Sequence, residues 1–186
     1  MIHRALASLV ALALVAGCSK PAPAAGGSAS PAAAASSAAA PAAAAAPAPA
    51  VAGPEVAGTY TGNGKPATLT QVTAHVGEPF DDKPVTLLVF TAKDQGGDAK
   101  ADFDALFGKF GDAIVVKVQP DGNVIGVDVL HSGLKEPGSI SISGVMTMQD
   151  YRAAGGQISG HLTSGGPTDV FGQKLQVDLT FHTKAP

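Results

Sequence analysis

The chain of 186 residues has a formal net charge of −3, one cysteine and no tryptophan. All 15 acidic residues and 10 of the 12 basic residues lie in residues 54–186, so this part carries a formal charge of −5. The acidic balance argues against binding to nucleic acid or to an anionic membrane surface. A single cysteine leaves no partner for an internal disulfide, so packing alone must hold the folded part together.

The first 18 residues, MIHRALASLVALALVAGC, have the layout of an export signal. Arg4 lies near the start, an apolar run extends from Ala5 to Ala16, and small residues precede Cys18. A positive start, an apolar stretch of about 7 to 15 residues and a small-residue cleavage site are typical of a secretory signal peptide. The run is too short for a transmembrane helix, which needs about 20 apolar residues.

The end of this segment, LVAGC, resembles a bacterial lipoprotein lipobox, in which Leu or Val, then Ala, Ser or Thr, then Gly or Ala precede a cysteine. The resemblance implies cleavage after Gly17, diacylglycerol on the Cys18 sulfur and a further acyl chain on the new amine. Several chains would make a durable anchor, because one chain alone binds a membrane only marginally. We therefore predict a lipoprotein signal peptide at 1–17 and lipidation at Cys18. An ordinary export signal, cut nearby and leaving a free thiol, is the alternative.

The residue after the cysteine bears on which membrane would hold the anchor. In Gram-negative lipoproteins an aspartate at that position resembles a retention signal for the inner membrane, and here it is Ser19. This favours the outer membrane, with the protein facing the periplasm.

Residues 18–53 follow as a stretch of alanine, proline, serine and glycine with a single charge, Lys20. Proline interrupts the alanine runs, so none reaches the roughly 12 to 15 residues that an isolated helix needs. A composition with so little bulky apolar area predicts a disordered, partly polyproline-like tether. Such a tether would be a spacer that lifts a domain off the lipid, or a linker whose length has no particular role.

Residues 54–186 are predicted to form one β-rich globular domain. Asn63-Gly64 separates two runs rich in Thr, Tyr and Val, the strongest short signal for a hairpin. Pro120-Asp121-Gly122-Asn123 is a second turn between two apolar runs. In the later strands apolar and polar residues alternate, which places on one face of each run Ile140, Ile142, Met146 and Met148, then Ile158 and Leu162, then Leu175, Val177, Leu179 and Phe181.

Residues 84–92, PVTLLVFTA, are apolar on both faces, so the strand that they form needs cover on both sides. The only helical candidate, 98–111, could supply it. Its apolar residues recur at i, i+3, i+4 and i+7 and predict one packed stripe: Phe103, Leu106, Phe107 and Phe110. The alternative is a lid or an element that dips into a membrane.

About eight short strands and one helix predict an all-β, mainly antiparallel fold, a β-sandwich or small barrel with one short helix. The pattern does not choose between the sandwich and the barrel.

The sequence contains no G-x-S-x-G, H-E-x-x-H, P-loop or C-x-x-C motif, and nothing in it predicts a cofactor. Four histidines of the domain are the remaining candidates for chemistry. His161 and His182 should face solvent and would be neighbours if their strands pair, which makes them weak candidates for a metal site. His131 is predicted at the rim of the core, and His75 has no assigned place. Four carboxylates should be solvated, on outward strand faces or in a loop: Asp128, Asp178, Asp81 and Asp82.

These patterns predict a membrane-anchored envelope lipoprotein whose β domain binds or has a structural role and is not an enzyme. Its expected partners are the lipid bilayer, through acylated Cys18, and an envelope protein. Two alternatives stay open: a carrier of a lipid or another small apolar ligand, and a histidine-based metalloenzyme or hydrolase. Carbohydrate and nucleobase sites usually depend on exposed flat rings, and the domain has no tryptophan and only two tyrosines, Tyr60 and Tyr151, so such sites are disfavoured.

Overall fold

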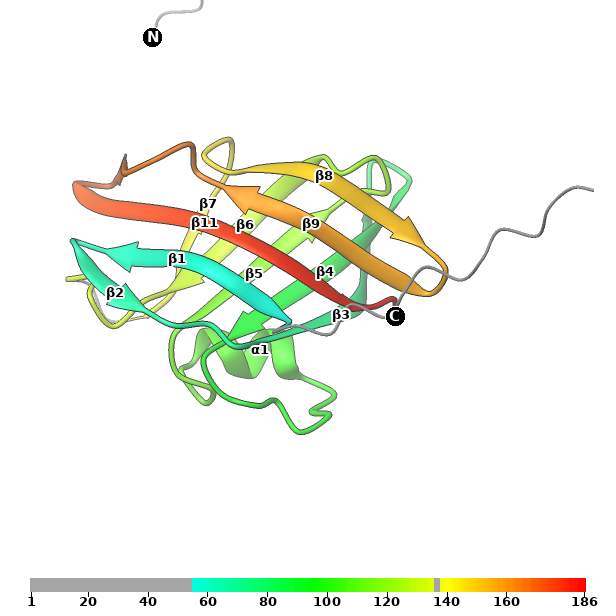
Figure 1. The fold of residues 1–186 in the computed structure, drawn as a ribbon, viewed down its shortest axis with the longest axis horizontal. Coiled ribbons are helices and arrows are strands. Elements are labelled where there is room, and N and C mark those ends of the chain that lie inside the picture. The colour runs from blue at the N-terminus through cyan, green and yellow to red at the C-terminus, as the bar shows by residue number, and fades with distance from the viewer. Residues whose placement is uncertain (1–54, 136–137) are drawn as a thin grey trace, which may run out of the picture. The chain divides into compact units, whose positions relative to one another are not determined.

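The structure, a computed structural model, describes residues 55–135 and 138–186. The described chain forms two antiparallel sheets and one short helix, α1 (Ala101–Leu106). Figure 1 shows the two sheets as layers, with α1 beside the rear one. The predicted signal peptide (1–17) and the whole predicted tether (18–53), with Cys18, lie outside the described residues.

Sheet A has the strand order β2-β1-β11-β9-β8, with β10 paired to β11, and sheet B has the order β3-β4-β5-β6-β7. Neither sheet closes on itself, so of the two predicted architectures the sandwich is the one found. The strands of sheet A are β1 (Val56–Gly62), β2 (Lys65–Ala67), β8 (Thr147–Ala154), β9 (Gln157–Thr163), β10 (Thr168–Val170) and β11 (Gln173–Lys184). Those of sheet B are β3 (Gln71–Phe80), β4 (Lys83–Thr91), β5 (Ala113–Val118), β6 (Val124–Leu130) and β7 (Ile140–Ile142).

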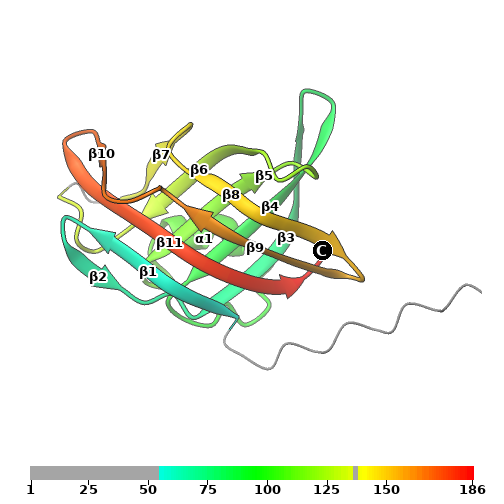
Figure 2. The same ribbon diagram turned by 45° about the horizontal axis from the view of Figure 1, so that its top comes forward.

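The turn chemistry of the sequence explains the hairpins. Asn63 and Gly64 have φ values of 51° and 77° and join β1 to β2, as a two-residue turn with left-handed residues requires. Gly122, with φ of 85°, makes the predicted turn between β5 and β6. Asp81 and Asp82 form a third turn at φ of 49° and 57°, at the tip of the β3–β4 hairpin that projects beyond the sheets in Figure 2.

The main core lies between the two sheets, where the alternating apolar residues of the facing strands meet. Phe90 of β4 packs edge-on against Phe181 of β11, with ring centroids 5.1 Å apart. Tyr60 of β1 is buried there too, and its hydroxyl donates to the carbonyl of Leu130, 2.9 Å away in β6. The predicted inward residues of β9 and β11 are all buried: Ile158, Leu162, Leu175, Val177, Leu179 and Phe181.

The run SISISGVMTM differs from a single alternating strand. β7 ends at Ile142 in sheet B, the chain turns at Gly144 with φ of 70°, and Met148 lies in β8 of sheet A. Ile140, Ile142, Met146 and Met148 nevertheless contact the same core, because the two sheets enclose it from opposite sides. The shared apolar face is confirmed, although two strands of different sheets provide it.

The predicted helix covers β4, but only Leu106 and Phe110 of the predicted stripe pack there; the prediction is wrong for Phe103 and Phe107. α1 buries Ala101 and Ala105 against a second, smaller cluster that includes Val89 of β4 and Val115 of β5. The helix ends at Leu106, and Gly108, with φ of 80°, turns the chain so that Phe110 returns to this cluster from outside the helix. Small alanines let the backbone lie close to the sheet. Phe103 and Phe107 therefore point away from the cluster, with exposed fractions of 58% and 75%.

Candidate functional site

The outer face of sheet B, turned away from sheet A, is apolar in part: Val89 is paired with Val115 there, and Leu87 with Lys117. α1 covers one end of this face, where it packs in a cluster with Val89, Ala113 and Val115 and with the partly buried Leu130. Beside the helix lies an open hollow of about 470 Å³, whose lining includes Val85 and Leu87 of β4 and Asp102 of α1. The hollow reaches from the helix to the β3–β4 hairpin, so the two elements border one continuous surface.

Four of the five large hydrophobic side chains that are exposed in the described residues belong to these bordering elements. Val76 and Phe80, 79% and 51% exposed, line the hollow from the hairpin, and Phe103 and Phe107 lie on α1. The fifth, Phe171, lies in the turn between β10 and β11. We call the set Phe80, Leu87, Phe103 and Phe107 the apolar surface. Exposed apolar groups gathered in this way mark interaction sites more often than scattered ones do.

The two aromatic rings of α1 are held side by side. Phe103 and Phe107 are four residues apart, a spacing that places side chains on the same side of a helix. Their ring centroids are 4.6 Å apart, with 39° between the ring planes. Each ring limits the freedom of the other, so the pair is a preformed apolar ridge on the solvent side of the helix.

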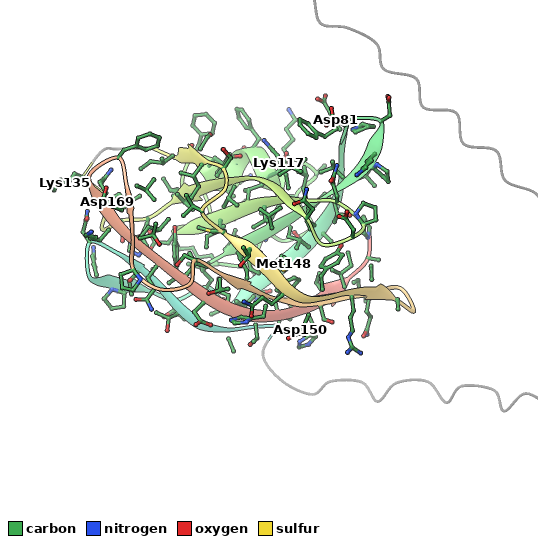
Figure 3. The ribbon with its side chains drawn as sticks, turned by 90° about the horizontal axis from the view of Figure 1, so that it is seen from above. Asp81, Lys117, Lys135, Met148, Asp150 and Asp169 are labelled. Carbon is green, nitrogen blue, oxygen red and sulfur yellow. The ribbon has the colours of Figure 1, made fainter. Side chains whose placement is uncertain are left out.

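The charges around α1 are largely paired with one another. Lys109 forms ion pairs with Asp98 and Asp104, and its Nζ lies 2.7 Å from Asp104 Oδ2. The hydrogen bond from Lys109 lowers the pKa of Asp98, and the hydrogen bond to Asp104 raises the pKa of Lys109. Farther along the face, Lys117 Nζ lies 3.5 Å from Asp128 Oδ2. In Figure 3, Lys117 and Asp81 lie on the side of the molecule opposite Asp150 of sheet A.

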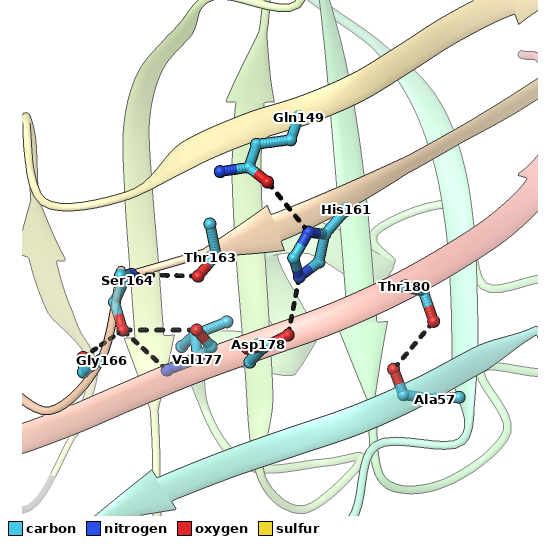
Figure 4. A network of polar contacts seen from close by, with 10 residues as sticks. Ala57, Gln149, His161, Thr163, Ser164, Gly166, Val177, Asp178 and Thr180 are labelled. Carbon is cyan, nitrogen blue, oxygen red and sulfur yellow. Dashed lines mark hydrogen bonds and ion pairs between the residues drawn. The ribbon is translucent and has the colours of Figure 1, made fainter.

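The outer face of sheet A is polar and holds the best-connected histidine. His161 of β9 lies between two neighbouring strands (Figure 4), with Nε2 2.6 Å from Asp178 Oδ1 of β11 and Nδ1 3.2 Å from Gln149 Oε1 of β8. Neither contact is with a hydroxyl that could act as a nucleophile. The three side chains connect β8, β9 and β11 across the surface of the sheet.

His161 and His182 both lie on this outer face, as predicted, and β9 and β11 do pair. His161 is opposite Thr180 and His182 is opposite Ser159, so the two histidines are diagonal neighbours on the ladder. His161 makes its contacts to Gln149 and Asp178 and not to His182. In residues 55–135 and 138–186 no group of three His, Cys, Asp or Glu side chains could hold a metal ion.

His131 is more deeply buried than the predicted rim position, with 4% of its surface exposed. Its ring meets Tyr60 edge-on, with centroids 4.6 Å apart, and Nδ1 accepts a hydrogen bond of 2.8 Å from the Gly133 backbone. Nε2 is buried and has no hydrogen-bond partner among the described residues. Burial lowers the pKa of His131, against the opposing effect of the Asp112 carboxylate, so the ring is neutral at pH 7. An open hollow of about 490 Å³ lies beside it, but the buried Nε2 is not exposed to that hollow.

The other candidate side chains occupy the predicted kinds of place. Asp128 lies on the outer face of sheet B and accepts a hydrogen bond from the Ser141 hydroxyl. Asp81 and Asp82 form the exposed hairpin tip. His75 is half-buried in β3, with Nε2 2.8 Å from the Thr73 hydroxyl. None of these arrangements combines a nucleophile, a base and a charge stabiliser, the set that most hydrolytic sites need.

The apolar surface is the feature that reasoning from the sequence missed. The helical stripe predicted that Phe103 and Phe107 pack inward, whereas the structure turns them outward. Gly108 was the available signal, because a glycine directly after two turns commonly ends a helix and so changes which residues share its buried side.

Comparison of the chain with protein-family models, with curated proteins and with solved structures finds no match. None of the helices described in the structure is long and apolar enough to cross a membrane.

Proposed function

We propose that this protein is a bacterial envelope lipoprotein, anchored in the outer membrane through acylated Cys18, whose β domain works on the periplasmic side by binding and not by catalysis. The anchoring part rests on the sequence, where a lipobox-like segment ends an export signal and Ser19 follows it. The binding part rests on one structural observation, the apolar surface on the outer face of sheet B.

An apolar surface of this kind supports binding because folding alone gives no reason to expose it. The side of α1 that stabilises the fold is made of Ala101 and Ala105, which are buried, and the phenylalanines lie on the other side. Two solvent-facing aromatic rings add nothing to the packing of the helix on the sheet, and they carry a cost in solubility. A partner that covers them would remove this cost.

The two alternative functions have less support. A carrier would hold its ligand in an enclosed cavity, whereas five hollows of about 280 to 490 Å³ found on the described residues all open to solvent. A metalloenzyme or hydrolase would use His161 and His182, and the contacts of His161 are with a carboxylate and an amide on an exposed face. Neither alternative has a specific observation in its favour.

Substitution of the proposed lipid attachment residue tests the anchoring. In Cys18→Ser we expect the protein to lose its acyl label and to leave the membrane fraction, because no sulfur remains to carry the diacylglycerol. The matched control is Ser19→Asp, which should keep the label and move the protein to the inner membrane. A Cys18→Ser protein that still partitions into membranes with an acyl label would contradict the proposal.

A further inference from the structure

We propose that the outer face of sheet B docks on the bilayer itself, with Phe103 and Phe107 inserted at the boundary between lipid headgroups and acyl chains. The inference deepens the proposed function, since it rests on a domain that is already anchored to a membrane. It names the lipid surface, and not a protein, as the partner of the apolar surface.

The shape of the helix suits an interface between water and hydrocarbon. Phe103 and Phe107 are the outermost side chains of α1, while Ala101 and Ala105 hold the helix on the sheet. Amphipathic helices of peripheral proteins lie in the plane of the membrane with their apolar side a few ångströms deep. Here the sheet fixes the helix in position beforehand, so docking needs no folding step and orders few side chains.

The length of chain before the described residues keeps the docking surface close to lipid. Residues 19–54 separate Cys18 from Glu55, and 36 residues reach at most about 120 to 130 Å when fully extended. A tether of that length gives the docking surface an effective concentration at the bilayer in the millimolar range. Even weak insertion by two aromatic rings would then persist for much of the time.

The tether joins the domain at the start of β1 in sheet A, across the core from α1. The Glu55 carbonyl accepts a hydrogen bond of 3.0 Å from the His182 backbone, and Val56 lies opposite Phe181. Phe181 in turn packs on Phe90, the neighbour of Val89 beneath α1. The path from the tether to the helix thus crosses the core and sheet B, and it is the length of the tether that lets the domain turn the outer face of sheet B toward the bilayer.

The charges near the ridge determine which lipid the surface should prefer. Around α1, three carboxylates (Asp98, Asp102 and Asp104) accompany two ammonium groups (Lys100 and Lys109), and Lys109 pairs with two of the three carboxylates. The remaining imbalance is slight and negative, and residues 54–186 as a whole carry −5. Docking should therefore be stronger on zwitterionic than on anionic lipid, the reverse of a polybasic membrane site.

The absence of tryptophan from the chain makes a direct test possible. Phe107→Trp, in the full lipidated chain reconstituted into phosphatidylcholine vesicles, places a single fluorescent reporter on the ridge. We expect blue-shifted emission, and loss of most of that emission when the acyl chains carry bromine. Replacing part of the lipid by phosphatidylglycerol should weaken both effects.

The matched control is Thr180→Trp, at an exposed position on the outer face of sheet A, which is turned the other way. It has the same tether and lipid, so its emission should stay that of a hydrated tryptophan, with little quenching. In the double variant Phe103→Ser/Phe107→Trp, brominated lipid should quench the emission less than in Phe107→Trp alone. The ridge then has only one aromatic ring and inserts more weakly. Thermal unfolding of each variant confirms that it is folded.

Equal quenching of the two tryptophans, or none at position 107, would overturn the docking proposal. So would a tryptophan at 107 that is shielded from water in native envelopes but not quenched by brominated lipid, since a protein would then cover the ridge. A failure of anchoring is distinguishable from these results, because it appears as loss of the acyl label and of membrane partition before any fluorescence is read.

Discussion

The outer faces of the two sheets are built from different side chains, although both belong to antiparallel layers around one core. Sheet A presents polar groups such as His161, Asp178 and Thr180, and no helix of residues 55–135 and 138–186 covers it. Sheet B presents apolar residues, and α1 covers only part of them. A polar face is stable in water as it stands, whereas a half-covered apolar face leaves free energy to be gained by further burial.

The two sides of α1 have different roles. Its inner side, Ala101 and Ala105, completes the fold of sheet B, and its outer side, Phe103 and Phe107, is available for a partner. A single face of sheet B therefore holds both a satellite core and a candidate binding surface. Substitutions of buried and of exposed residues should therefore have different effects on stability.

The largest effect should distinguish the buried phenylalanine from the exposed one. Phe110, which is 6% exposed, packs in the cluster under α1. Phe110→Ala should lower the free energy of unfolding by about 3 to 5 kcal/mol, because it leaves a cavity and loses buried apolar area. Phe107→Ala should change it by less than about 0.5 kcal/mol, since its ring already faces water. Urea denaturation of both variants measures the difference.

If both variants lost a similar, large free energy of unfolding, the prediction would be contradicted, because Phe107 would then contribute to the core. A small loss for both would instead show that α1 contributes little to the stability of sheet B.

An effect of intermediate size is expected at the buried His131, and none at the half-buried His182 on the outer face of sheet A. Because burial lowers the pKa of His131 in the native state, the unfolded chain, with a pKa of about 6.5, takes up a proton first as the pH falls. His131 therefore contributes stability above pH of about 6.5 that is lost on acidification through its native pKa. The free energy of unfolding should therefore fall as the pH drops below about 6.5.

His131→Gln should flatten that pH dependence, whatever its effect on stability at pH 7. His182→Gln is the control, because His182 lies on the outer face of sheet A and its substitution should leave the dependence as it is. A profile that His131→Gln does not change would mean that another group titrates in this range.

The smallest effect is expected for the ion pair on the polar face. His161 and Asp178 lie 2.6 Å apart, but the side chain of Asp178 is 57% exposed. A double-mutant cycle with His161→Ala and Asp178→Ala should give a coupling of about 0 to 1 kcal/mol, as for other exposed pairs. A coupling well above that range would indicate that the face of sheet A contains a site with a role of its own.

Much of the fold could be predicted because it depends on neighbours in sequence. The turn at Asn63-Gly64 follows from the tolerance of both residues for positive φ, and the alternation in β11 follows from the period of a strand. The double-sided apolar pattern of β4 correctly predicted that a second element would cover it. Each of these features is determined within about ten residues of chain.

The candidate site could not be predicted in the same way. A period of 3.6 shows which residues of a helix share a side, but the stripe through Phe103, Leu106, Phe107 and Phe110 required a helix that continued to residue 110. The helix ends after Leu106, so the residues that it buries are the alanines. That choice depends on how closely the helix approaches Val89 and Val115, residues that are distant along the chain.

The sequence by itself determined the all-β class, the main turns, the inward faces of the strands, and the prediction of an export signal with lipid attachment at Cys18. Local preferences suffice for these, since they depend on backbone dihedrals, strand period and short motifs. Only the tertiary structure decided that the sheets form a sandwich, that SISISGVMTM divides between two sheets, and that the phenylalanines of α1 face outward. Those outcomes depend on which surfaces pack when distant segments meet, and packing is a property of pairs of surfaces that neither segment contains alone.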